Sequence, residues 1–98
     1  MNLSITKEEL TKMLLTNTPV MILDVRDKEE YLAQHLPFAG NIPIKIIEAG
    51  LFIPEPGKKV ITVCGKGGGR SEKAAIQLRS DFHTEAYFLE GGTFGFYL

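Results

Sequence analysis

The residues with the clearest chemical potential form one stretch, Cys64-Gly65-Lys66-Gly67-Gly68-Gly69-Arg70-Ser71. It directly follows the apolar run Val60-Ile61-Thr62-Val63, which is typical of a buried strand. Glycines tolerate positive φ, so successive backbone amides of such a turn can point into one concavity and bind an anion. A helix that begins near Arg70 adds the unpaired amides of its N-terminus, and the Arg70 guanidinium can hold an oxyanion through two parallel hydrogen bonds.

Cys64 is the predicted nucleophile of this loop. An anion-binding turn favours the thiolate form of a cysteine, and the same amides can hold an anion that becomes attached to its sulfur. The alternative is a cysteine buried as a small apolar side chain at a strand end. The glycines and Arg70 favour the catalytic interpretation. We therefore predict that the substrate is bound by the rest of the loop, namely Gly65, Lys66, Gly67, Gly68, Gly69, Arg70 and Ser71.

Nucleotide-binding loops have a different pattern. A Walker A loop ends in Gly-Lys-Ser or Gly-Lys-Thr, whereas this loop ends in Gly-Arg-Ser and starts with a cysteine. Its glycines also do not reproduce the Gly-x-Gly-x-x-Gly pattern of dinucleotide sites. The sequence therefore favours cysteine chemistry over nucleotide binding.

The composition excludes several classes of protein. The 98 residues are 44% apolar and 23% charged, with a formal net charge of −1. These values are typical of one small globular domain, and they argue against disorder and against a protein built for nucleic acid or an anionic membrane. The single cysteine cannot form an internal disulfide or a thiolate metal cluster. No apolar run approaches the roughly 20 residues of a membrane span, and no signal peptide is visible, so we expect a cytoplasmic protein.

The elements that must position the loop follow from capping and periodicity. Capping boxes at Thr6–Glu9 and Asp27–Glu30 predict two helices, and a third, longer helix is expected over Ser71–Ser80. Further expected elements are strands at Val20–Leu23, Asn41–Ile44, Val60–Val63 and Glu85–Leu89, a brief helix at Ile46–Leu51, and an aromatic tail after Gly91-Gly92. This alternation predicts one α/β domain over residues 1–98, with a mostly parallel sheet flanked by helices on both faces. The loop then lies at the carboxyl ends of the strands, where ligands bind in such sheets.

A set of motifs in a fixed order extends the loop pattern along most of the chain. They are Ile22-Leu23-Asp24-Val25-Arg26, Glu29-Glu30-Tyr31, His35-Leu36-Pro37-Phe38-Ala39-Gly40-Asn41-Ile42-Pro43, the Cys64 loop and Leu89-Glu90-Gly91-Gly92. From about Val20 to Phe96, this combination resembles the single-domain rhodanese (thiosulfate sulfurtransferase) family. The resemblance implies a five-stranded, mostly parallel sheet with the catalytic loop after a central strand.

The resemblance also implies a reaction. Cys64 attacks the outer sulfur of thiosulfate or a similar sulfane donor and forms a persulfide, while Arg70 binds the donor oxyanion or orients the loop, and Lys66 assists. A thiophilic acceptor then takes the sulfur, and no metal or organic cofactor takes part. Because the chain has no second cysteine, the acceptor is cyanide, an external thiol or a cysteine of a partner protein.

One departure from the family keeps two alternatives open. The family commonly has four residues between the cysteine and the arginine, whereas this loop has five, which is also the spacing of cysteine-dependent phosphatases and related arsenate reductases. Those enzymes place His before the cysteine, where this chain has Val63, and they need a general acid, for which Glu90 is the nearest candidate by topology. The other alternative is a non-catalytic rhodanese-like binding module.

Three side-chain roles outside the loop are predicted. Arg26 follows a strand end and is a candidate substrate contact, although an ion pair with Asp24 or helix-capping hydrogen bonds that hold the loop are the favoured interpretation. For His35, a hydrogen bond that stabilises its turn is favoured over a role as a base for Cys64. The aromatic tail could pair two copies weakly, so we expect a monomer or a weak homodimer.

Overall fold

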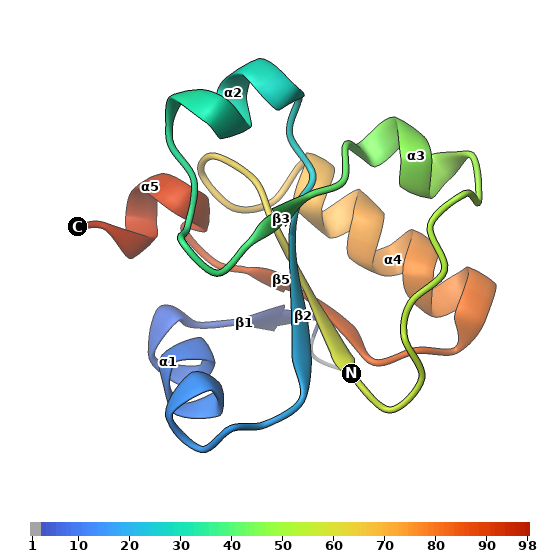
Figure 1. Cartoon of the computed structure of the whole chain (residues 1–98), viewed down its shortest axis with the longest axis horizontal. Coiled ribbons are helices and arrows are strands. Elements are labelled where there is room, and N and C mark those ends of the chain that lie inside the picture. The colour runs from blue at the N-terminus through green and yellow to red at the C-terminus, as the bar shows by residue number, and fades with distance from the viewer. Residues whose placement is uncertain (1–2) are drawn as a thin grey trace.

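The computed structural model describes residues 3–98, which form a parallel sheet with helices around it (Figure 1). The strands of this part of the chain are β1 (Ser4–Ile5), β2 (Val20–Asp24), β3 (Gly40–Asn41), β4 (Lys59–Val63) and β5 (Ala86–Leu89). The helices are α1 (Lys7–Leu15), α2 (Lys28–Ala33), α3 (Ile44–Glu48), α4 (Arg70–Phe82) and α5 (Gly92–Phe96).

The sheet has the strand order β1-β5-β4-β2-β3, and every pairing is parallel. The central strands β2 and β4 pair over their whole length, from Val20 opposite Lys59 to Asp24 opposite Val63. Four of the five residues of β4 are buried, as expected for a strand covered on both faces. The predicted α/β class and parallel sheet are confirmed, and the Cys64 loop leaves the sheet at the carboxyl end of its middle strand.

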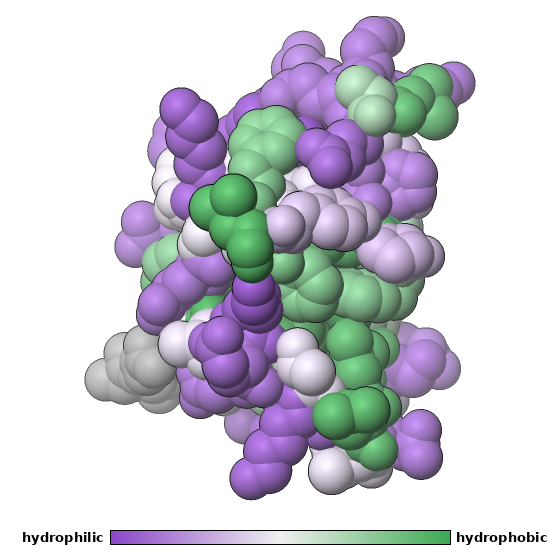
Figure 2. Space-filling model, turned by 90° about the vertical axis from the view of Figure 1, so that its left-hand side faces the viewer, coloured by the Kyte–Doolittle hydropathy of each residue, from purple (hydrophilic) through white to green (hydrophobic). Residues whose placement is uncertain are grey.

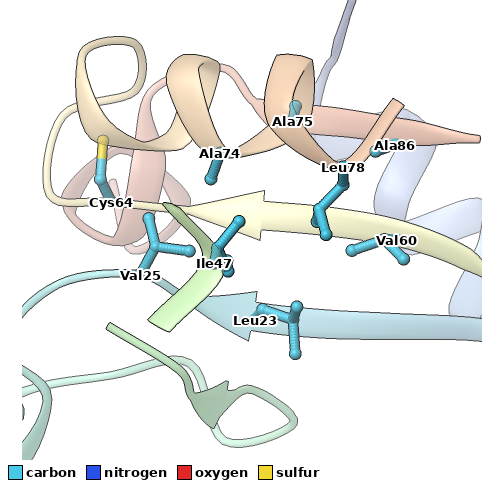
Figure 3. Packing of buried hydrophobic residues seen from close by; sticks show 9 residues of the cluster. All are labelled: Leu23, Val25, Ile47, Val60, Cys64, Ala74, Ala75, Leu78 and Ala86. Carbon is cyan, nitrogen blue, oxygen red and sulfur yellow. The ribbon is translucent and has the colours of Figure 1, made fainter. Parts of the chain in front are cut away.

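Helices cover both faces of the sheet, with α1 and α5 on one side and α3 and α4 on the other, while α2 lies over the carboxyl edge (Figure 1). Two apolar layers result. The layer toward α3 and α4 contains Leu23, Val25, Ile47, Val60, Cys64, Ala74, Ala75, Leu78 and Ala86 (Figure 3). The layer toward α1 contains Ile5, Leu10, Ile22, Leu36, Ala39, Ile61, Val63 and Leu89. Both layers extend to the carboxyl end of β4, so apolar side chains pack on the base of the loop from both faces of the sheet.

Four local predictions differ from the structure. The edge strand is β3 at Gly40–Asn41 rather than Asn41–Ile44, and the following helix begins at Ile44 rather than Ile46, directly after the N-cap Pro43. Proline fixes its own φ near the value that a helix start needs, which allows the earlier beginning. Strand β1 was not predicted, because two residues carry no periodicity. The expected aromatic tail forms the short helix α5.

The face that carries α1 and α5 is partly apolar. Figure 2 shows apolar side chains gathered across the middle of this face, among hydrophilic ones. The large exposed apolar residues of α1, of α5 and of the chain that follows are Leu15, Phe94, Tyr97 and Leu98. A monomer or a weak homodimer stays the prediction for the oligomeric state. None of the helices in residues 3–98 is long and apolar enough to cross a lipid bilayer.

Candidate active site

The catalytic loop folds tightly because it takes backbone conformations that glycine allows. Gly67 has a φ of +83°, and a Cβ atom built on it would lie 2.5 Å from the backbone nitrogen of Gly91 and 3.0 Å from the carbonyl oxygen of Leu89. Only a residue without a side chain fits there, because both the dihedral angle and the space exclude a Cβ. The loop therefore packs backbone against backbone on the turn between β5 and α5.

Cys64 lies at the base of this loop, directly after β4, and its sulfur points toward the loop that leads into α4 (Figure 3). The residue is 7% exposed. Its Sγ donates a hydrogen bond to the carbonyl oxygen of Gly68 over 3.0 Å and lies 3.2 Å from the hydroxyl oxygen of Ser71. Its own carbonyl accepts a hydrogen bond from the amide of Thr93 in α5. Cys64 is thus fixed through its backbone as well as its side chain.

Ser71 is fully buried and supports the loop from below. Its hydroxyl oxygen accepts a hydrogen bond from the amide of Gly68 over 3.2 Å and donates one to the Gly68 carbonyl over 3.0 Å. Its backbone carbonyl accepts a hydrogen bond from the Thr62 hydroxyl, which joins the start of α4 to β4. Ser71 does not line the pocket above the loop, although its hydroxyl oxygen lies 3.2 Å from the sulfur.

The loop forms the floor of an open pocket of about 400 Å³. The pocket is lined by Glu30, Phe94 and the residues from Cys64 to Arg70. Within residues 3–98, the backbone amides of Lys66, Gly67 and Gly69 have no hydrogen-bond acceptor, so they are available to an anion. A larger hollow of about 440 Å³ lies at the start of β5, around Arg79 and Tyr87, and no cysteine lines it. The predicted loop residues other than Ser71 therefore meet in one pocket.

Arg70 does not enter the pocket as a free cation, because it forms a two-pronged ion pair with Glu30 of α2. The two guanidinium nitrogens lie 2.7 and 3.0 Å from the two carboxylate oxygens. Hydrogen bonding to Arg70 lowers the pKa of Glu30 to about 2. The pKa of Arg70 is raised, first by this hydrogen bond and further by the charges of Glu30, Cys64 and Asp27. Both charges are therefore present throughout the neutral range.

The match to a family model decides the classification. The model of the rhodanese-like domain matches residues 6–98, which is nearly the whole described chain. This chain belongs to the rhodanese-like domain family. A search of curated proteins gave no match.

Solved structures of other rhodanese-like domains and related proteins have the same fold. A rhodanese-like domain protein from Staphylococcus aureus is 35% identical, with a TM-score of 0.82 over 98% of this chain and 91% of that chain. A human single-domain sulfurtransferase is 24% identical, with a TM-score of 0.81 over 94% and 92%. A Rhodopseudomonas palustris protein described as a possible tyrosine phosphatase is 21% identical, with a TM-score of 0.81 over 98% and 80%. The last two likenesses concern the fold alone.

Arg26 of this rhodanese-like domain is buried in an ion pair rather than placed in the pocket. Its Nε and Nη2 atoms donate to Asp24 over 3.0 and 2.8 Å, and Nη2 also donates to the carbonyl of Gln34 over 2.6 Å. The side chains of Arg26 and Asp24 are 2% and 0% exposed. The predicted ion pair between Arg26 and Asp24 is present, and that it holds the loop stays a prediction. A direct contact between Arg26 and substrate stays a prediction, and the pocket lining does not include this residue.

Two further polar side chains, His35 and Glu90, were considered for a role in the site. His35 lies 2.7 Å from the carbonyl of Tyr31 through Nδ1 and stacks on its ring, so the predicted turn-stabilising role is confirmed. Glu90, proposed from topology as the nearest carboxylate, does not line the pocket and instead accepts a hydrogen bond from Ser4. The carboxylate that the rhodanese-like pocket does contain is Glu30. No group of three or more His, Cys, Asp or Glu side chains within residues 3–98 could hold a metal ion.

Glu30 was missed as a site residue because its sequence signal was already explained. It is the last residue of the Asp27–Glu30 capping box, and its Oε1 accepts a hydrogen bond from the Asp27 amide over 3.3 Å. The same oxygen also faces Arg70, which is 40 residues further along the chain. Only the packing of α2 over the loop brings the two together, and no local pattern records that contact.

Proposed function

We propose that this rhodanese-like domain is a sulfurtransferase that carries sulfane sulfur on Cys64. The thiolate of Cys64 attacks the outer sulfur of a donor such as thiosulfate. A bond forms between the two sulfur atoms, the sulfur–sulfur bond of the donor breaks, and its electron pair leaves with sulfite. An acceptor thiolate or cyanide then attacks the outer sulfur of the persulfide and restores the Cys64 thiolate. The cycle is a double displacement that needs no net oxidant or reductant.

The observation that carries this proposal is the position of Cys64 at the floor of a pocket with unpaired backbone amides. The amides of Lys66, Gly67 and Gly69 can hold the persulfide anion or the oxygens of the donor. The Ser71 hydroxyl, 3.2 Å from Sγ, is a donor for the thiolate once the proton has left. The membership in the rhodanese-like domain family supports the same activity.

A cysteine-dependent phosphatase or arsenate reductase is the second candidate, and the five residues between Cys64 and Arg70 favour it. Such an enzyme needs a general acid to protonate the leaving oxygen, a contribution of about 10²- to 10⁴-fold. The carboxyl group in this pocket, Glu30, has a pKa of about 2 and holds no proton at neutral pH. Sulfite needs no such proton, so the charge state of Glu30 supports sulfur transfer.

The acceptor lies outside this chain. Cys64 is its single cysteine, so the persulfide cannot pass to a second thiol of the same molecule. The pocket is open to solvent on the side of Phe94, which is 45% exposed. A small thiol or a cysteine on a partner protein is therefore the proposed acceptor, in a cytoplasmic setting where free thiols persist.

The proposed function is tested by mass spectrometry of the intact protein after incubation with thiosulfate. The expected result is a gain of one sulfur atom, lost again on addition of cyanide or a thiol. The Cys64→Ser variant should gain nothing, and wild-type protein incubated with sulfate is the matched control. An adduct that survives the substitution would contradict the role of Cys64.

The same samples separate the alternatives. Turnover of an aryl phosphate with inhibition by orthovanadate, and no sulfur adduct, would favour the phosphatase. Failure of both reactions, together with a Cys64 that does not react with alkylating agents at neutral pH, would favour a binding module.

A further inference from the structure

The pocket contains an unexpected negative charge at the place where an anion donor must bind. The sequence predicts Arg70 as a free clamp for a donor oxyanion. In the structure, the two guanidinium nitrogens that would form this clamp already bind both oxygens of Glu30, at 2.7 and 3.0 Å. Both partners are part of the pocket lining, and their side chains are 40% and 41% exposed. The pair therefore meets any incoming donor directly.

The charges around the pocket cancel instead of adding up to a positive site. Lys66 and Arg70 supply two cations to the lining, and Glu30 supplies one carboxylate. The negative charge of Asp27, one turn before Glu30, also raises the pKa of Arg70. The Cys64 thiolate adds a further negative charge when it forms. A donor with two negative charges then gains little from the side chains and is repelled by Glu30 more strongly than a donor with one.

We propose that Glu30 selects the charge of the sulfur donor, so that the site takes monoanionic sulfane donors, such as persulfides of the form RSS⁻, in preference to dianions. This inference rests on the proposed sulfur transfer through Cys64. The thiolate of Cys64 attacks the outer sulfur of RSS⁻. The bond between this sulfur and R–S breaks, and RS⁻ leaves with the electron pair. Glu30 touches no reacting atom and acts through its charge.

The Glu30→Gln variant isolates this charge. Glutamine keeps an oxygen that can accept the hydrogen bonds of Asp27 and of one Arg70 nitrogen, and it is a normal member of a capping box. Helix α2 and Arg70 therefore stay in place while the negative charge is removed. The matched control is Glu29→Gln, because Glu29 is exposed, adjacent in α2, and outside the pocket lining.

The experiment compares persulfide formation from two donors of different charge. Thiosulfate is a dianion, and methanethiosulfonate is a monoanion that delivers sulfur with methanesulfinate as the leaving group. We expect Glu30→Gln to raise the ratio of kcat/KM for thiosulfate to kcat/KM for methanethiosulfonate by about three- to tenfold, the effect of one nearby charge on one additional donor charge. Glu29→Gln should leave the ratio unchanged. Effects on the reactivity of Cys64 act on both donors and cancel in the ratio.

A second variant separates charge from positioning. Glu30→Asp keeps the negative charge but is too short to hold both Arg70 nitrogens, so its ratio should stay at the wild-type value even if both rates fall. Equal changes for both donors in Glu30→Gln, or a ratio shift in Glu30→Asp as large as in Glu30→Gln, would overturn the inference. A wild-type protein that forms no persulfide from either donor would instead overturn the proposed function, and the inference with it.

Discussion

At the scale of single residues, the site is a small hydrogen-bond network around one sulfur atom. The Cys64 thiol donates to the Gly68 carbonyl, and the Ser71 hydroxyl bonds to both the carbonyl and the amide of Gly68. When the thiol ionises, the Gly68 carbonyl loses the thiol as a donor and faces a negative sulfur. The Ser71 hydroxyl can turn its proton to that sulfur, and this makes it the side chain on which the reactive form depends.

Replacing Ser71 by alanine tests this dependence. We expect Ser71→Ala to slow the reaction of Cys64 with iodoacetamide at pH 7 by roughly tenfold, because a hydrogen bond to an ionised group contributes about 1.5 kcal/mol or more. The rate of persulfide formation from thiosulfate should fall in parallel. Ser80→Ala, at an exposed position near the end of α4, is the control and should change neither rate. An unchanged alkylation rate in Ser71→Ala would show that the hydroxyl does not stabilise the thiolate.

The sequence allowed the nucleophile and its loop to be predicted, but not the charge balance of the pocket. Cys64, the glycines and Arg70 are contiguous, so a local pattern contains them. The partner of Arg70 is Glu30, 40 residues away, and the partner of Cys64 Sγ is a backbone carbonyl, which no sequence pattern distinguishes. Ion pairs with a distant partner depend on how helices pack, so no partner of Arg70 was predicted, and the carboxylate named from topology, as a candidate general acid, was Glu90.

At the scale of elements, the catalytic loop depends on the turn between β5 and α5. The amides of Thr93 and Phe94 at the start of α5 donate to the carbonyls of Cys64 and Gly65. Gly67 packs on Gly91 from the other side of this contact. The last helix of the described chain therefore fixes the backbone of the nucleophile, although it contributes only Phe94 to the pocket lining.

Gly67→Ala tests how closely the two segments must approach. Alanine at φ +83° costs about 1–2 kcal/mol, and its Cβ would also meet the backbone of Gly91 at 2.5 Å, so the loop must move. We expect persulfide formation to fall by at least about tenfold, while far-UV circular dichroism shows a folded protein. Gly50→Ala is the matched control, because its φ is +73° and nothing lies within 4 Å of its added Cβ.

Both variants place an alanine at a positive φ, but only Gly67→Ala also brings a Cβ atom against a neighbouring backbone. The expected pattern is a larger loss of unfolding free energy in Gly67→Ala than in Gly50→Ala, with persulfide formation reduced only in Gly67→Ala. A Gly67→Ala protein with wild-type persulfide formation would mean that the loop does not need this contact for catalysis.

The long elements were predictable and the short ones were not. Strands β2 and β4 are apolar over several residues, and helices α1 and α2 begin at polar capping boxes. Strand β1 has two residues and is defined only by its pairing with β5, and α5 begins at the second of two glycines that predict a turn. Their structure comes from partners elsewhere in the chain, which local propensity does not contain.

At the scale of the whole molecule, two apolar layers hold one sheet between helices. Leu10 of α1 is completely buried in the layer that also contains Val63, next to the catalytic cysteine in the chain. It does not line the pocket. The stability of the molecule and the chemistry of the loop should therefore respond differently to a change at this position.

Leu10→Ala tests that separation. Removing a fully buried leucine side chain is expected to lower the free energy of unfolding by about 2–5 kcal/mol, measured by urea denaturation. Persulfide formation per folded molecule should stay at the wild-type rate. Leu15→Ala in the same helix is the control, because Leu15 is 79% exposed and its loss should change stability by no more than about 0.5 kcal/mol. A slow Leu10→Ala enzyme that is fully folded would show that α1 also positions the loop.

The strand order has a consequence for the chain during synthesis. Within residues 3–98, strand β1 pairs only with β5, with Ser4 opposite Phe88 and Ile5 opposite Leu89, so β1 cannot join the sheet until β5 has been synthesised. Until β5 arrives, one edge of β4 is open and the loop lacks the turn that supports it. A stalled nascent chain that ends before Ala86 thus exposes a β4 edge that can pair with other chains, and it carries Cys64 without the β5–α5 turn that fixes the Cys64 backbone.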